Sequence, residues 1–341
     1  MATPTSHPII DSHIHLYPAS ELDTLAWCTP GHPLARQTSV SDFRKTSSDQ
    51  TQGFIFLETD RKNNNSTSWT DPLAEISWLR RIVEDKPREG EGHAPGDSQL
   101  CLGIVPWAPI NLGREKVEEW LERAKETAGE ETWERVKGFR YLLQDKEDGT
   151  AVTDEFIEGL KVLGRKGFVF DVGVDQHRRG RKQLEEAVEM VERAHEGVKE
   201  GEKVVFVLNH LCKPDLTIVN TTTDPSFIAW RTAMFTLSKC DTAYMKLSGC
   251  FAEMPEHLAQ QDDPNRIFEI LYPWFAVVLA AFGPSRIMFG SDWPVCTVNG
   301  GEGAWEKWRK VVERMCFMAS LSEDDKSMIW SGTARRAYGI E

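Results

Sequence analysis

Eight short runs of apolar and β-branched residues recur along the chain, separated by stretches with the period of an amphipathic helix. The runs cover residues 8–13, 53–57, 100–105, 136–142, 167–172, 203–209, 242–247 and 286–291. The helical stretches cover residues 71–84, 114–128, 153–163, 181–198, 225–237, 264–282 and 303–318. Each run has the length of a buried strand, and each helical stretch gathers its apolar side chains on one stripe. This alternation predicts parallel strands joined by helical crossovers.

Eight strand–helix units favour one architecture, a closed TIM-type (β/α)8 barrel. An open doubly wound α/β sheet is the alternative. The dinucleotide fingerprint G-x-G-x-x-G is absent after the first run, which weighs against the Rossmann form of that alternative. The segment 84–98 is rich in Gly, Pro and charge, which is typical of a surface loop rather than of a domain boundary. We therefore expect a single α/β barrel domain spanning residues 1–341.

The chain is acidic, with a formal net charge of −13 over 341 residues. Nucleic acids and anionic membranes recruit basic surfaces, so the sequence argues against both as partners. Seven cysteines occur without a C-x-x-C pair, which indicates free thiols in a reducing cytosol. The N-terminus, MATPTSHPII, lacks the features of a signal peptide, and the apolar stretch Leu271–Gly283 is too short to span a bilayer. We expect a soluble cytoplasmic protein.

Polar residues gather where three of the predicted strands end, which is where barrel enzymes carry their active sites. His13 and His15 lie two residues apart on the first strand, so both side chains point the same way, as metal ligands or substrate contacts. His210 follows the sixth strand and Asp292 the eighth. A carboxylate at that depth is costly to bury unless it is paired or functional, so Asp292 is the best candidate for a general base or metal ligand. A core histidine and a helix cap are the structural alternatives for His210 and Asp292.

Four further side chains keep two interpretations each. Arg140 on the fourth strand can offer a planar fork to a substrate or form a structural ion pair. His177 falls in the loop after the fifth strand, where an exposed histidine without a role is the default. Lys246 and Glu58, on the seventh and second strands, can reach the site or point away from it. The motifs G-x-S-x-G, H-E-x-x-H and the Walker loop are absent from the sequence, which disfavours the enzyme classes they mark.

Seven short stretches resemble, in order, the motifs of one known family. They are IDSHIHLYP, VKGFRYLLQD, FDVGV, FVLNHLCKP, YMKLSG, RIMFGSDWPV and GTARRAYGI. Together they span nearly the whole chain and resemble the amidohydrolase-related metal-dependent hydrolases, in particular their sugar-lactonase branch. DVGVDQHRR and NHLCKP are most similar to L-rhamnonolactonases of the fungal type. The resemblance implies an amidohydrolase-like barrel and a carboxylic-ester hydrolase that opens a sugar-acid lactone, first of all L-rhamnono-1,4-lactone.

The resemblance also implies roles for individual residues. Catalysis falls to Asp292, which activates water, and to His210, which polarises the lactone carbonyl. The implied substrate contacts are Arg140, Gln144, His177, His13 and His15. A bound metal would be held by His13, His15 and Asp292, and mixed nitrogen and oxygen ligands suit zinc or manganese. No organic cofactor is implied.

The sequence departs from the family at two points. Many relatives carry Asp before the strand-six histidine, where this chain has Asn209, and that change alters the surroundings of His210. Neither a carboxylated lysine nor the fourth histidine of a binuclear centre is evident, so one divalent ion or none remains open. Two rival functions also remain: a non-oxidative decarboxylase or other carbonyl hydrolase on the same barrel, and a non-catalytic barrel that binds a sugar acid. The expected partner is a small sugar lactone, and homo-oligomer formation stays open.

Overall fold

The computed structural model describes residues 7–63 and 69–341, and its strands form a closed parallel ring. The strands are β1 (Ile9–Ile14), β2 (Thr51–Leu57), β3 (Cys101–Val105), β4 (Gly138–Arg140), β5 (Val169–Val172), β6 (Val205–Leu208), β7 (Ala243–Leu247) and β8 (Ile287–Phe289). Sequential strands pair in parallel within the sets β1–β3 and β4–β8. Parallel bridges Ile104–Val136 and Ile14–Trp293 join the two sets at both seams. The predicted barrel is confirmed.

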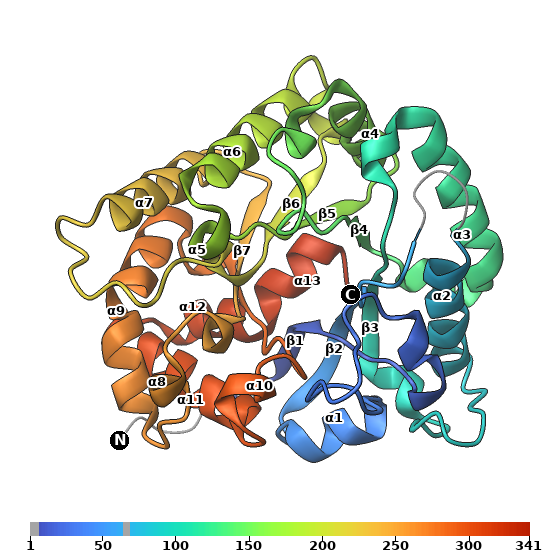
Figure 1. The fold of residues 1–341 in the computed structure, drawn as a ribbon, viewed down its shortest axis with the longest axis horizontal. Helices are drawn as coiled ribbons and strands as arrows, with labels where there is room; N and C mark the ends of the chain where they lie inside the picture. Colours follow the sequence, from blue (N-terminus) through green and yellow to red (C-terminus); the bar gives the residue numbers. More distant parts are fainter. Residues whose placement is uncertain (1–6, 64–68) are drawn as a thin grey trace.

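Helices surround this ring, as Figure 1 shows, and their bounds follow the predicted stretches closely. The main outer helices are α2 (Thr70–Val83), α3 (Gly113–Arg135), α4 (Asp154–Arg165), α6 (Arg181–His195), α7 (Pro225–Leu237), α9 (Pro264–Phe282) and α11 (Ala304–Met318). The shorter helices are α1 (Val40–Thr46), α5 (Gln176–Arg179), α8 (Glu256–Ala259), α10 (Thr297–Gly300), α12 (Glu323–Ser327) and α13 (Thr333–Tyr338). The predicted end of α3 at residue 128 coincides with a break, because Gly129 adopts a positive φ of 69°.

An Asp-Pro pair explains why α7 and α9 begin where they do. The side chain of Asp224 accepts hydrogen bonds from the backbone amides of Ser226 and Phe227, and Asp263 does the same for Asn265. The proline that follows each aspartate needs no backbone partner at the first helical position and holds the φ angle of a helix. Both helix starts were therefore readable from the sequence.

Helix α9 is the described helix that is long and apolar enough, by length and composition, to cross a membrane. It runs for 19 residues and so extends beyond the apolar stretch singled out in the sequence. One face, with Leu271, Trp274 and Phe275, is buried in the protein, and α9 packs against α7 and α11. Such packing is typical of an outer helix of a barrel.

The inside of the ring is filled from one end by the C-terminal segment. Side chains of the strands, including Ile10, Val105 and Val207, form an inner core that also takes in Ala334 and Tyr338 of α13. In Figure 1, α13 lies across the middle of the ring. A polar opening remains at the carboxyl ends of the strands, where the candidate site lies.

Candidate active site

A cavity of about 370 Å³ opens at the carboxyl ends of the strands. Its wall includes six of the residues singled out from the sequence: His15, Glu58, Arg140, Gln144, His210 and Asp292. The remaining wall mixes aromatic and aliphatic side chains with carboxylates and an amide: Tyr17, Trp27, His32, Leu34, Asp60, Leu142, Asp145, Val295, Val298 and Asn299. This composition suits a small, neutral molecule with several hydroxyl groups and some apolar surface.

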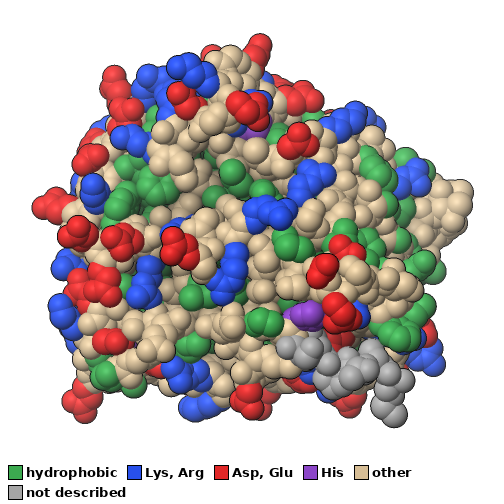
Figure 2. All heavy atoms as spheres, turned by 180° about the vertical axis from the view of Figure 1, so that it is seen from behind, with side chains coloured by type: hydrophobic (Ala, Val, Ile, Leu, Met, Phe, Trp, Pro, Cys, Tyr) green, Lys and Arg blue, Asp and Glu red, His purple; other side chains and the backbone are tan. Residues whose placement is uncertain are grey.

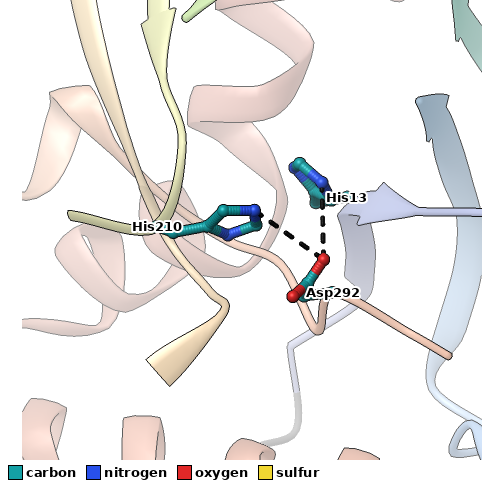
Figure 3. A group of neighbouring side chains, drawn as sticks. All are labelled: His13, His210 and Asp292. Carbon is teal, nitrogen blue, oxygen red and sulfur yellow. Dashed lines mark ion pairs between the residues drawn. The ribbon is translucent and has the colours of Figure 1, made fainter. Parts of the chain in front are cut away.

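Three imidazoles meet one carboxylate oxygen at the floor of the cavity. The Nε2 atoms of His13, His15 and His210 lie 3.6, 3.5 and 3.7 Å from Oδ1 of Asp292. The Nε2 atoms of His13 and His15 are themselves 3.2 Å apart. Figure 3 shows His13, His210 and Asp292 directed at one another; His13 is on β1 and Asp292 follows the neighbouring strand β8, whereas His210 follows β6.

The backbone holds two of these residues in a conformation that most residues avoid. Asp292 has a φ of 60°, and its amide donates to the carbonyl oxygen of His13 at 2.9 Å. His210 has a φ of 55° and begins a run of four left-handed residues that ends at Lys213. Each such residue costs roughly 1–3 kcal/mol, so the surrounding fold must fix it. Of these residues, His210, Lys213 and Asp292 line the cavity.

Hydrogen bonds fix the orientation of two of the imidazoles. Nδ1 of His15 lies 3.0 Å from the carbonyl oxygens of both Leu57 and Glu58. Carbonyl oxygens only accept, so Nδ1 carries the proton and Nε2 presents a lone pair to the cavity. Nδ1 of His210 lies 2.8 Å from the hydroxyl of Ser248, which can donate or accept. His210 can therefore adopt either tautomer.

Burial sets the protonation states of the floor. It lowers the pKa of His210 to about 3 and places that of His13 well below its usual value, so both rings are neutral at neutral pH. Burial alone would raise the pKa of Asp292, but the neighbouring His210 and His15 outweigh it and keep the pKa below its ordinary value. Asp292 is thus an ionised carboxylate beside the neutral rings of His13 and His210, a state suited to accepting a proton.

Behind His13 lies a buried chain of polar groups that reaches the C-terminal helix. Nζ of Lys246 is 3.3 Å from Nδ1 of His13 and 2.6 Å from Oδ1 of Asp171. The hydroxyl of Tyr338 on α13 donates to Oδ2 of the same aspartate at 2.7 Å. All four side chains are buried. Lys246 therefore points inward, and Asp171 and Tyr338 are supporting residues that the sequence analysis did not identify.

Arg140 forms a structural ion pair and also lines the cavity. Its Nε donates to Oε1 of Glu58, and its Nη2 donates to the Glu58 carbonyl oxygen, both at 2.7 Å. Gln144 lies on the wall beside Lys213, whose ammonium donates to the Gln144 side-chain oxygen at 2.6 Å. Both interpretations of Arg140 are thus compatible, because a residue held rigidly by Glu58 is also positioned for a ligand.

His177 lies beside the cavity rather than on its wall. Its Nδ1 is 2.9 Å from a carboxylate oxygen of Glu253, and its Nε2 is 3.4 Å from one of Asp215. With both ring nitrogens engaged by carboxylates, the geometry gives no support to the predicted substrate contact. Asn209 is buried, and its amide atoms find no hydrogen-bond partner within residues 7–63 and 69–341.

The four groups on the floor fit a divalent cation. Ligand atoms around a tetrahedral zinc ion with bonds of 2.0–2.1 Å are separated by about 3.4 Å. The Nε2 atoms of His13 and His15 are 3.2 Å apart, and the three imidazoles lie 3.5–3.7 Å from Oδ1 of Asp292, which is close to that value. His13, His210 and Asp292 form a compact cluster of potential ligands, and His15 lies against the same oxygen. Nε2 of His15 is ready to bind a metal. His13 is the least prepared, because the ammonium of Lys246 donates to its Nδ1 and so leaves the ring proton on Nε2, the atom that faces Asp292.

Comparison with known proteins places the whole chain among related sequences. A family model described as amidohydrolase matches residues 135–340. The L-rhamnono-gamma-lactonase of Scheffersomyces stipitis is 32% identical over 349 residues, covering 98% of this chain and 100% of that protein. The L-fucono-1,5-lactonase of Burkholderia multivorans is 29% identical over 72% of this chain and 73% of its own length. A crystal structure of an amidohydrolase from B. multivorans with bound zinc matches with a TM-score of 0.74 and 25% identity, covering 98% of this chain and 99% of that one.

Proposed function

The chain belongs to the amidohydrolase family, and from that membership we propose that it is a hydrolase that opens the ring of a sugar-acid lactone. The observation that carries the proposal is the meeting of three imidazoles and the ionised Asp292 at the floor of a cavity of about 370 Å³. The carboxylate can activate water, and an imidazole can polarise a carbonyl group. Lactonase relatives that align over most of the chain support the choice of substrate.

Asp292 is the proposed general base. Its carboxylate takes a proton from a water molecule, and the resulting hydroxide attacks the lactone carbonyl carbon. The C–O bond of the ring then breaks, and Asp292 returns the proton to the leaving ring oxygen. The products are a hydroxyl group and a carboxylic acid, which ionises at neutral pH, so turnover releases acid. His210 can donate from Nε2 to the carbonyl oxygen if the Ser248 hydroxyl donates to its Nδ1.

The same floor can hold one divalent ion, for which we propose zinc. His13, His210 and Asp292 form the compact set of ligand atoms, and His15, whose Nε2 lies 3.5 Å from Oδ1 of Asp292, can complete it. Such an ion, when bound, lowers the pKa of a coordinated water and polarises a carbonyl oxygen. His210 would then bind through Nε2, with the proton on Nδ1 donated to Ser248. The zinc-bound relative supports this choice over manganese.

L-rhamnono-1,4-lactone is the proposed substrate. The full-length similarity to the L-rhamnono-gamma-lactonase of S. stipitis supports this choice. The cavity wall is consistent with a deoxysugar lactone, because Asp60, Gln144 and Asn299 can bind hydroxyl groups while Val295 and Val298 offer apolar surface to a methyl group. We also propose that residues 1–341 act as a single domain in the cytoplasm, a location supported by seven free cysteines.

A pH-indicator assay on a panel of aldonolactones, run with and without a chelator, tests the proposal. We expect acid release from L-rhamnono-1,4-lactone, and a fall in kcat of at least about a thousandfold for Asp292→Asn with the fold intact by circular dichroism. Asp241→Asn, the same change at an exposed position at the other end of the barrel, is the matched control. Near-normal turnover by Asp292→Asn would refute the assigned role. Silence across the panel, with zinc or manganese added, would instead favour another carbonyl reaction such as decarboxylation.

The assay with a chelator distinguishes the two roles proposed for His210, as a donor to the carbonyl oxygen or as a zinc ligand through Nε2. If zinc is resident, elemental analysis finds about one equivalent, and its removal lowers both the rate and the melting temperature. Activity that survives complete removal of metal would assign carbonyl polarisation to the His210 N–H alone.

A further inference from the structure

A cysteine and a histidine lie in contact at the opposite end of the barrel from the cavity, at the amino ends of β6 and β7. His195 is the last residue of α6, and Cys240 lies between α7 and β7. Sγ of Cys240 is 3.8 Å from Nδ1 of His195, within hydrogen-bond distance for sulfur. Both side chains line a groove of about 320 Å³ on the surface of the protein. A thiol next to a base in an open groove is the arrangement of an activated nucleophile.

The tautomer of His195 is fixed by the backbone. Its Nε2 lies 2.8 Å from the carbonyl oxygen of Val204, and a carbonyl oxygen cannot donate, so Nε2 carries the proton. The lone pair of the neutral ring is therefore on Nδ1, directed at the sulfur. Thr242 also contacts the thiol: its hydroxyl oxygen lies 3.4 Å from Sγ and donates to the same Val204 oxygen at 3.3 Å. The Val204 carbonyl oxygen therefore orients the His195 ring so that Nδ1 can accept the proton of the Cys240 thiol.

Within residues 7–63 and 69–341, the other cysteines show no hydrogen bond to a histidine. Burial raises the pKa of Cys101, Cys212 and Cys316 to about 12. Burial would also raise the pKa of Cys240, but its hydrogen bonds to His195 and Thr242 outweigh that effect and bring the pKa below the ordinary value. Cys28, which is also partly exposed, offers a natural reference thiol within the same chain.

The charges around the groove are mixed. Glu192, Glu200 and Asp241 face it together with Lys203 and Lys239, and Lys203 is paired with Glu200 at 2.6 Å. No single sign of charge dominates the approach to the sulfur, so the groove suits a small zwitterionic reagent better than a strongly charged one.

We propose that Cys240 is a reactive thiol, activated by His195, and that this groove is a site of covalent modification by low-molecular-weight disulfides. Nδ1 of His195 takes the thiol proton. The thiolate sulfur attacks one sulfur of the small disulfide, that S–S bond breaks, and a new S–S bond forms at Cys240. The other half leaves as a thiolate and takes up a proton, from the imidazolium or from solvent. A small thiol reverses the reaction by the same exchange.

The experiment uses the full-length protein with two probes, iodoacetamide and cystine, a small zwitterionic disulfide without net charge at pH 7, followed by peptide mass spectrometry. We expect Cys240 to react first with both probes, roughly fivefold faster than Cys28 at pH 7, because its thiolate fraction is larger while its intrinsic nucleophilicity is somewhat lower. The pH at which its alkylation rate reaches half-maximum should lie below that of Cys28.

His195→Gln tests the role of the base directly. The variant should slow labelling of Cys240 several-fold and move its pH midpoint upward, while Cys28→Ser leaves the Cys240 profile unchanged. Lactone hydrolysis and the melting curve report whether His195→Gln remains folded; if it does not, Thr242→Val, which removes only the second hydrogen bond, provides a smaller shift in the same direction. Labelling of Cys240 no faster than Cys28, or a pH profile indifferent to both variants, would overturn the proposal.

Discussion

Replacing Glu75 by Gln should make the stability of the protein less dependent on pH. Glu75 lies on α2 and is fully buried, where its Oε1 accepts from the backbone amide and the hydroxyl of Thr59 at 3.1 and 2.5 Å. Its Oε2 is buried without a hydrogen-bond partner among the described residues. Burial raises the pKa of this carboxyl to about 7, although the guanidinium of Arg61 opposes the rise. The folded protein therefore favours the protonated form.

The magnitude follows from the shift. Between a reference pKa of 4.5 and the folded value of about 7, ionisation of Glu75 costs the folded state roughly 3.4 kcal/mol when complete. Because the folded pKa is raised, the stabilising contribution is fully present below pH 4.5 and is lost as the pH rises through 7. Between pH 5 and pH 8 the loss amounts to about 2.5 kcal/mol, a large share of a typical unfolding free energy of roughly 5–15 kcal/mol.

Urea unfolding of the wild type and of Glu75→Gln at pH 5 and pH 8 measures this contribution. Gln resembles the protonated carboxyl and cannot ionise, so every other titrating group cancels in the difference between the two proteins. Relative to the wild type, Glu75→Gln should gain about 2.5 kcal/mol on going from pH 5 to pH 8, whatever its absolute stability. A difference between the proteins that is the same at both pH values would refute the assigned pKa. Glu84→Gln is the matched control, because Glu84 at the end of the same helix pairs with Lys86 and Arg80, which lower rather than raise its pKa.

Two further substitutions test the supports of the site. Tyr338→Phe removes the donor to Oδ2 of Asp171 and should cost about 1–3 kcal/mol, seen as a lower melting temperature; an unchanged melting temperature would show that this hydroxyl contributes nothing. Arg140→Lys cannot reproduce the two contacts with Glu58, and it should lower kcat/KM for the lactone at least about tenfold by initial rates, whereas wild-type kinetics would leave Arg140 without a role in the cavity.

The barrel could be predicted because its signals are local. Apolar runs of strand length alternate with helical stripes, and several helix bounds, such as those of α7 and α9, are marked by an Asp-Pro pair. Helix α13 was not predicted, although its residues were recognised as part of a family motif. Its place depends on the inside of the ring, which only forms when all eight strands have closed. A helix of six residues has too few positions to form an apolar stripe, so its sequence does not show which surface it packs against.

The floor of the cavity could be predicted in part for a similar reason. His13, His15, His210 and Asp292 each sit at the end of a strand, and a parallel barrel brings all strand ends to one mouth. His177 lies in the short helix α5 of the segment that follows β5, and nothing in the local sequence tells whether it faces the cavity or, as here, the carboxylates of Glu253 and Asp215. Strand-end position therefore predicted which side chains meet at the floor of the cavity, whereas the position of a residue in a connecting segment did not predict where its side chain points.

Lys246 shows what the sequence lacks even within the strands. A lysine in an apolar strand can point outward or be buried with a partner, and the sequence near it contains no acidic residue that could decide the matter. The partner, Asp171, lies on β5, two strands away, with β6 between them. In the pairing register Asp171 is level with Val207, and Val207 with Tyr244, so Lys246 stands two residues further along β7. The long lysine side chain spans this stagger and reaches the aspartate at 2.6 Å. Register is a property of the closed barrel, and for that reason the charge pair beneath His13 becomes visible only when the strands are placed side by side.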